Sequence, residues 1–141
     1  MANLKKIVEE YLKAIPKREF DKARKLMHPK YSYTGADGKR HEGIEAGIGV
    51  GEMYTNAFPD LRLDVKYIHV AGNIVVAEFV GSGTHKGELM GITPTGKKAK
   101  VPVCSIMEFR DDKIYAEREY FDTAVMLQQL GVEVLKPGAA V

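Results

Sequence analysis

Residues 61–67 read Leu-Arg-Leu-Asp-Val-Lys-Tyr, an unbroken alternation of apolar and charged side chains. Successive side chains of a β-strand point to opposite faces, so this alternation predicts a half-buried strand. The segment follows Phe-Pro-Asp at residues 58–60, where the preceding helical periodicity ends. The chain therefore changes from helix to sheet near residue 60.

Upstream of this point, apolar residues recur at the spacing of a helix. They fall at i, i+3, i+4, i+7, i+8 and i+11, and they are Leu4, Ile7, Val8, Tyr11, Leu12 and Ile15. This stripe predicts an amphipathic helix, with Asn3 as its N-cap and Pro16 at its end. A second short helix is predicted from Phe20 to Leu26.

A third helix is predicted from Ile44 toward Phe58, although its sequence is rich in glycine. Glycines occupy positions 43, 47, 49 and 51, and each glycine inside a helix costs about 1 kcal/mol relative to alanine. Such a helix either packs closely against a neighbour or is interrupted.

Downstream of residue 67, three more strands are predicted at residues 74–81, 98–110 and 114–121, with turns at 71–73 and 110–113. A glycine-rich loop at 83–97 separates the first two, and a last short helix is predicted at 123–130. Helices followed by an antiparallel meander indicate an α+β domain whose helices cover one face of the sheet. We predict a single domain over residues 1–131 and a tail at residues 132–141.

The composition excludes several classes of protein. The 141 residues are 45% hydrophobic and 28% charged, as in an ordinary globular domain. With 21 Lys and Arg against 19 Asp and Glu, the net charge of +2 is too small to favour a nucleic-acid partner. The one cysteine, Cys104, rules out an internal disulfide. The charged amino terminus and the lack of a long apolar stretch predict a cytoplasmic protein without a membrane partner.

Two motifs that would indicate a cofactor or a metal are incomplete. Residues 91–98 carry a Lys where a phosphate-binding loop needs Ser or Thr, and a strand follows where that motif needs a helix. The four histidines lie at positions 28, 41, 69 and 85, without the spacing of metal ligands. We therefore expect no cofactor and no metal.

The last predicted strand has two faces of different chemistry. One face carries Ile114, Ala116, Arg118, Tyr120 and Asp122, and the other carries Tyr115, Glu117, Glu119 and Phe121. Turning the second face inward would bury two like charges, so we favour the first face as the one toward the helices. Arg118, Tyr120 and Asp122 would then be polar groups inside a cavity. Asp122 also precedes the last helix, where Asp is a favoured N-cap without any catalytic role.

Several segments resemble the SnoaL-like polyketide cyclases, and together they span nearly the whole chain. They are residues 58–61, the loop Gly-Thr-His-Lys-Gly-Glu-Leu-Met-Gly-Ile-Thr-Pro-Thr-Gly-Lys at 83–97, residues 111–114, Tyr-Phe-Asp at 120–122 and Leu-Gln-Gln-Leu-Gly at 127–131. The resemblance implies the nuclear-transport-factor-2-like fold, a cystatin-like α+β barrel in which a curved antiparallel sheet wraps around helices into a cone.

The resemblance also implies a homodimer. Apolar residues predicted on the outer face of the sheet favour a dimer, because exposing a continuous apolar surface to water is unfavourable. These residues are Ile68, Val70, Ile74 and Val76.

The activity implied by the resemblance is a cofactor-independent intramolecular aldol condensation that closes a ring of a polyketide ester. An Asp at the end of the last strand is the family's acid and base, and Asp122 matches that position. His85, in the Gly-Thr-His motif, would place or polarise the ligand. The substrate, a small apolar carbonyl or polyketide-like compound, would contact Tyr54, Phe58, Met90, Glu108, Arg118 and Tyr120.

The chain departs from the family pattern at several positions. Typical members have Gly at 112, Glu at 116 and Trp at 118, where this chain has Asp, Ala and Arg. A histidine of the family's third strand falls near Met107 or Glu108, and Arg118 is spaced to pair with Asp122. Three functions remain open: a cyclase, isomerase or lyase using Asp122; a non-catalytic binder of a hydrophobic or weakly anionic ligand; and a hydrolase or dehydratase on the same fold.

Overall fold

The change from helices to sheet near residue 60 is present in the computed structural model, which describes residues 2–133. Before it lie α1 (Leu4–Ala14), α2 (Phe20–Lys25), β1 (Met27–Thr34), β2 (Arg40–Glu42) and α3 (Ile44–Ala57). After it lie β3 (Arg62–Ala71), β4 (Ile74–Thr84), β5 (Lys98–Arg110), β6 (Lys113–Tyr120) and α4 (Thr123–Gln129). The tail predicted at 132–141 lies, beyond residue 133, outside the described residues.

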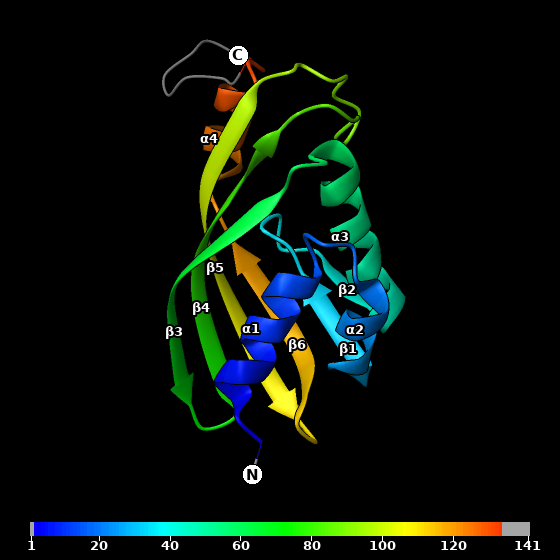
Figure 1. Ribbon diagram of the computed structural model, residues 1–141, viewed down its shortest axis with the longest axis vertical. Coiled ribbons are helices and arrows are strands. Elements are labelled where there is room, and N and C mark those ends of the chain that lie inside the picture. Colours follow the sequence, from blue (N-terminus) through cyan, green and yellow to red (C-terminus); the bar gives the residue numbers. More distant parts are fainter. Residues whose placement is uncertain (1, 134–141) are drawn as a thin grey trace.

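Six strands form one curved, open sheet in the order β2-β1-β6-β5-β4-β3 (Figure 1). Four of the five pairings are antiparallel, as predicted, but β1 runs parallel to β6. The predicted meander of four strands is confirmed, and β1, which lies outside it, adds one parallel pairing. Only a tight hairpin forces an antiparallel pairing, and β1 and β6 are separated by α3 and several other strands.

Helices α1, α2 and α3 lie on the same side of the sheet, whereas α4 packs near one end of β5 (Figure 1). The predicted stripe of α1 is buried here, with Val8 and Leu12 among its buried residues. From the sheet, Val75, Ala77, Met107 and Ile114 complete this core. The fold is thus α+β, with a concave face that the helices only partly fill.

The glycine-rich helix α3 is continuous, and one of its glycines explains why. A Cβ atom at position 47 would lie 2.5 Å from Cε1 of Tyr31, so only glycine lets the helix approach β1 this closely. Position 49 faces open space, because a Cβ atom placed there would have no neighbouring atom within 4 Å. Of the two possibilities that the sequence left open, close packing is the one realised.

The prediction of which face of β6 points inward is wrong, because a β-bulge interrupts the strand. Ile114 pairs with Phe109, but the next pair of the ladder joins Ala116 to Glu108, so Tyr115 is an extra residue. A bulge rotates the strand by one residue and exchanges its faces. Ile114 points inward before the bulge, and Glu117 and Glu119 point inward after it.

A second register shift, between Val65 and Tyr67, affects the predicted outer face of the sheet. Beyond it, Ile68 and Val70 pair with Ala77 and Val75, both fully buried, so they belong to the helix side of the sheet. Ile68 packs against the core there, whereas Val70, near the end of the strand, is 50% exposed. Ile74 and Val76 belong to the outer face as predicted. They share it with Ile106, Arg118 and Tyr120, their neighbours along the ladders.

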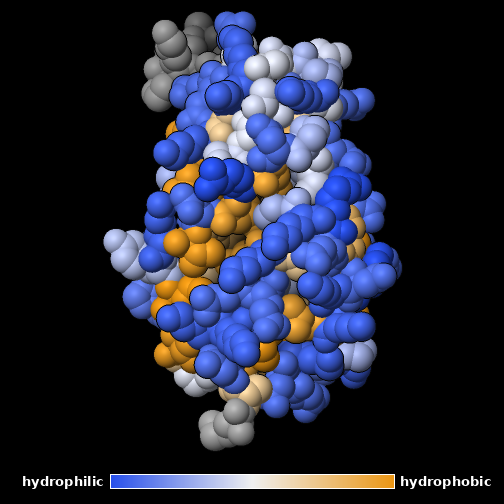
Figure 2. Space-filling view, in the orientation of Figure 1, coloured by the Kyte–Doolittle hydropathy of each residue, from blue (hydrophilic) through white to orange (hydrophobic). Residues whose placement is uncertain are grey.

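On the face that carries the helices, apolar side chains gather beside α1 and over the neighbouring strands (Figure 2). Hydrophilic side chains surround them. No helix among residues 2–133 is long and apolar enough to cross a membrane.

Candidate active site

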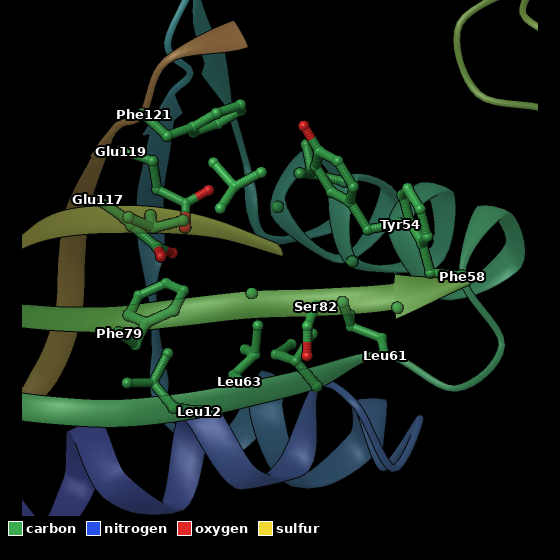
Figure 3. Close-up of a pocket in the computed structure, with 18 of the residues that line it drawn as sticks. Leu12, Tyr54, Phe58, Leu61, Leu63, Phe79, Ser82, Glu117, Glu119 and Phe121 are labelled. Carbon is green, nitrogen blue, oxygen red and sulfur yellow. The ribbon is translucent and has the colours of Figure 1, made fainter. Parts of the chain in front are cut away.

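A cavity opens on the concave face of the sheet, between β3–β6 and the helices α1 and α3. The cavity has a volume of about 130 Å³ and is open at its mouth. Figure 3 shows side chains from helices and strands converging on it. They include Leu12 of α1, Tyr54 of α3, Leu63 of β3, Phe79 of β4 and Glu119 of β6.

Most of the cavity wall is apolar, and its polar groups are carboxyl and hydroxyl groups. The carboxyl groups belong to Glu117 and Glu119, and the hydroxyl groups to Ser82 and the tyrosines Tyr11, Tyr31, Tyr33 and Tyr54. No lysine, arginine or histidine lines the cavity among the residues that the structure describes. The site is therefore acidic, with no counter-ion in its wall.

Glu117 is the deeper of the two acids, with 4% of its surface exposed. Its Oε1 accepts hydrogen bonds from the hydroxyls of Tyr11 (2.9 Å) and Tyr31 (2.7 Å), and its Oε2 accepts one from Ser105 (3.3 Å). Burial raises the pKa of Glu117, and these three donors oppose that rise. Burial also raises the pKa of both tyrosines, which remain protonated donors.

Glu119 lies nearer the cavity space and has fewer partners. Its Oε1 accepts a hydrogen bond of 2.7 Å from Tyr33, and within residues 2–133 its Oε2 has no hydrogen-bond donor. Burial, together with the nearby Glu117 carboxyl, raises the pKa of Glu119 to about 8. Glu119 thus carries an oxygen free to meet a ligand and titrates near neutral pH, as an acid–base catalyst should.

Of the residues predicted to bind substrate, only Tyr54 and Phe58 line the cavity. Arg118 faces the other side of the sheet, where its Nη1 lies 2.9 Å from Oε1 of Glu108. Arg118 and Glu108 therefore do not line the cavity, and among the described residues Arg118 pairs with Glu108 instead of Asp122. Tyr120 and Met90 are 54% and 61% exposed and lie outside the cavity wall. The bulge in β6 explains the displacement of Arg118 and Tyr120.

Asp122, predicted to be catalytic, is exposed and forms the N-cap of α4. Its Oδ1 accepts hydrogen bonds from the backbone N–H groups of Ala124 (3.0 Å) and Val125 (3.2 Å). It is not among the residues that line the cavity. The capping role that the sequence allowed for this residue is the one seen here.

His85, the other residue predicted to be catalytic, is fully buried and also lies outside the cavity wall. Its Nδ1 lies 3.2 Å from the backbone nitrogen of Thr95, whose N–H donates to it. Its backbone N–H and C=O pair with Lys97 and Gly96, and its ring packs against Phe58, with 5.6 Å between the ring centroids. His85 therefore joins the two ends of the loop 85–97 and packs against Phe58 of the cavity wall.

The two glutamates and their tyrosines line the cavity but were not among the residues that the sequence predicted. One signal was available: acids two residues apart on a strand lie on the same face. The partners in Tyr11, Tyr31 and Tyr33 come from residues more than 80 positions away, and no local pattern links them. Within residues 2–133, no three His, Cys, Asp or Glu side chains are grouped as metal ligands.

The site is a mostly apolar cavity with two acidic side chains, on the concave face of a curved sheet. Comparison with known proteins identifies the family. Residues 5–130 match the SnoaL-like polyketide cyclases. The chain belongs to this family.

Individual relatives agree with this assignment. The chain is 27% identical over 133 residues to the aklanonic acid methyl ester cyclase AcmA of Streptomyces galilaeus, covering 93% of this chain and 90% of the relative. The solved structure of IdmH from Streptomyces antibioticus, described as a candidate polyketide cyclase, superposes with a TM-score of 0.81 at 25% identity and covers 93% and 100% of the two chains.

The fold extends to proteins with other descriptions. AclR from Streptomyces galilaeus, described as a candidate hydroxylase, superposes with a TM-score of 0.82 at 24% identity, covering 96% of this chain and 85% of AclR. The fold is therefore shared by proteins described by different activities, and the reaction must be argued from the side chains of the site.

Proposed function

We propose that this protein catalyses a cofactor-independent intramolecular aldol cyclisation of a neutral polyketide-like ester, with Glu119 as general base and general acid. The observation that carries the proposal is the Glu119 carboxyl group. It faces an otherwise apolar cavity with one unpartnered oxygen among the described residues, and its pKa is raised to about 8. Membership of the cyclase family supports the same reaction.

In the proposed reaction, the Glu119 carboxylate removes a proton from the carbon between two carbonyl groups. The enolate carbon then attacks a second carbonyl of the same molecule, which forms the new C–C bond and an alkoxide. Glu119 returns its proton to that alkoxide, so the carboxylate is regenerated and no other reactant is consumed. Proton removal that leads to isomerisation or elimination would use the same residue.

The hydroxyl of Tyr54 is the second polar group that we assign to the reaction. It lies on α3, across the cavity from β6 (Figure 3). Burial raises the pKa of Tyr54 to about 12, so the hydroxyl remains protonated at neutral pH. It can donate a hydrogen bond to the carbonyl oxygen on which negative charge develops.

A neutral ester should be turned over, and the matching free acid should not. A carboxylate in the cavity would lie near Glu117 and Glu119 without any cation in the described wall to balance it, and an unpaired buried charge is costly. The measurement is kcat/KM for a linear β-keto methyl ester that carries a further, remote ketone as the carbonyl under attack, and for its free acid, each followed by the loss of starting material and the appearance of the ring. Equal or faster turnover of the acid would contradict the proposed substrate class.

We also propose that the protein is a homodimer through the outer face of β4, β5 and β6. That face presents apolar side chains of Ile74, Val76 and Ile106, which are only partly covered, and Tyr120, which is 54% exposed. A second copy would shield this surface from water. Sedimentation should give twice the 15.6 kDa mass of one chain, and Val76→Lys should reduce it to one. A wild-type protein that sediments as a monomer at micromolar concentration would contradict the proposal.

A further inference from the structure

The proposed reaction leaves the buried acid Glu117 without a role. Three elements of the fold each supply it with a hydroxyl donor: Tyr11 from α1, Tyr31 from β1 and Ser105 from β5. The Glu117 side chain is nearly inaccessible, so a substrate in the cavity does not need it as a ligand. The structure surrounds this carboxyl group with donors far more completely than Glu119, which receives one.

The arrangement indicates which of the two acids ionises first. Hydroxyl groups that donate to both oxygens of a carboxyl group favour its charged form. Glu117 accepts three such bonds and Glu119 accepts one, from Tyr33. The remaining titratable group in the wall, Tyr54, carries no charge at neutral pH, and no cation among the described residues faces either acid. When the pair carries one negative charge, that charge is therefore on Glu117.

The charge on Glu117 acts on Glu119 over a short distance. The two residues lie on the same face of β6, and same-face neighbours on a strand are about 6.6 Å apart at Cα. Figure 3 shows both carboxyl groups directed to the same side of the strand. In a poorly hydrated cavity, a like charge at this distance opposes ionisation of its neighbour.

We propose that Glu117 is a positioning residue for the reaction: its carboxylate, fixed by three hydroxyl donors, makes Glu119 a stronger base. This inference rests on the proposed function, in which Glu119 removes the proton. A stronger base removes a proton from carbon more readily and still releases it to the alkoxide. Tyr11 and Tyr31 therefore contribute to the reaction through Glu117, although they do not contact the reacting atoms.

The test is Glu117→Gln, which removes the charge and keeps an oxygen for Tyr11 and Tyr31. Two midpoints are measured: the ¹³C NMR titration of the Glu119 carboxyl carbon without substrate, and the rise of kcat/KM with pH for the β-keto methyl ester. Both should move to lower pH by about one unit or more, and the plateau of kcat should fall. Glu78→Gln, an equivalent change on the exposed face of β4, should move neither.

Tyr11→Phe provides a second variant in case the glutamine variant does not fold. It removes one donor from Glu117 and none from Glu119, so the midpoint of Glu119 should move in the same direction by a smaller amount. Unchanged midpoints in the folded variants would overturn the role of Glu117. A shifted NMR midpoint in a protein that turns over no keto ester would support the effect of Glu117 and contradict the proposed function.

Discussion

Glu119→Gln should lower kcat for the β-keto methyl ester about 10²- to 10⁴-fold, the range typical of a general acid–base residue. Glutamine has the shape of the acid but cannot accept the substrate proton. Its amide oxygen can still accept the hydrogen bond that Tyr33 donates to Glu119, so the cavity should keep its form. The measurement is kcat at neutral pH, with circular dichroism to show that the variant is folded.

Asp122→Asn is the matched control, because it makes the same chemical change three residues further along the chain. Asp122 caps α4 through its Oδ1, and Asn is an equally good N-cap. Both turnover and stability should therefore remain close to wild type. Loss of turnover in Asp122→Asn, with Glu119→Gln still active, would move the chemistry to Asp122 and contradict the role proposed for Glu119.

Gly47→Ala should destabilise the protein by about 1–3 kcal/mol, the usual cost of forcing an extra carbon into a packed interior. The new Cβ would lie 2.5 Å from the ring of Tyr31. Tyr31 is 1% exposed and has little room to move. Because the Tyr31 hydroxyl also holds Glu117, catalysis should fall together with stability. Urea unfolding gives the change in free energy.

Gly49→Ala, two residues along the same helix, separates this contact from the general effect of glycine on a helix. A Cβ at position 49 meets no atom within 4 Å, so the higher helix propensity of alanine should stabilise the protein by about 0.5–1 kcal/mol. If both variants shift stability in the same direction, the close approach of α3 to Tyr31 is not what position 47 requires.

Much of the fold could be predicted from sequence because hydrophobic periodicity is a local property. The stripe of α1, the alternation of β3 and the turn after Arg110 depend on neighbouring residues, and the predicted elements lie close to the observed ones. The strand β2 and the first half of β1 were missed. They are held by pairing with each other and with β6, which no local pattern reveals.

Most of the residues predicted for the site lie outside the cavity wall, and one bulge accounts for much of this difference. A strict alternation along the strand predicts that Ala116 and Arg118 point inward because Ile114 does. The extra residue Tyr115 exchanges the two faces, so both residues point outward instead. The cost of burying two acids was also overestimated. That cost applies to unpaired charges, whereas Glu117 and Glu119 receive hydroxyl donors from distant tyrosines, which offset the cost of burial.

A crystal structure of the protein with a β-keto methyl ester analogue that cannot cyclise tests the central claim most directly. We predict that the analogue lies in the cavity between Glu119 and Tyr54, with its acidic carbon within about 3.5 Å of Oε2 of Glu119. An analogue bound beside Asp122, or one whose acidic carbon points away from Glu119, would contradict the proposed mechanism.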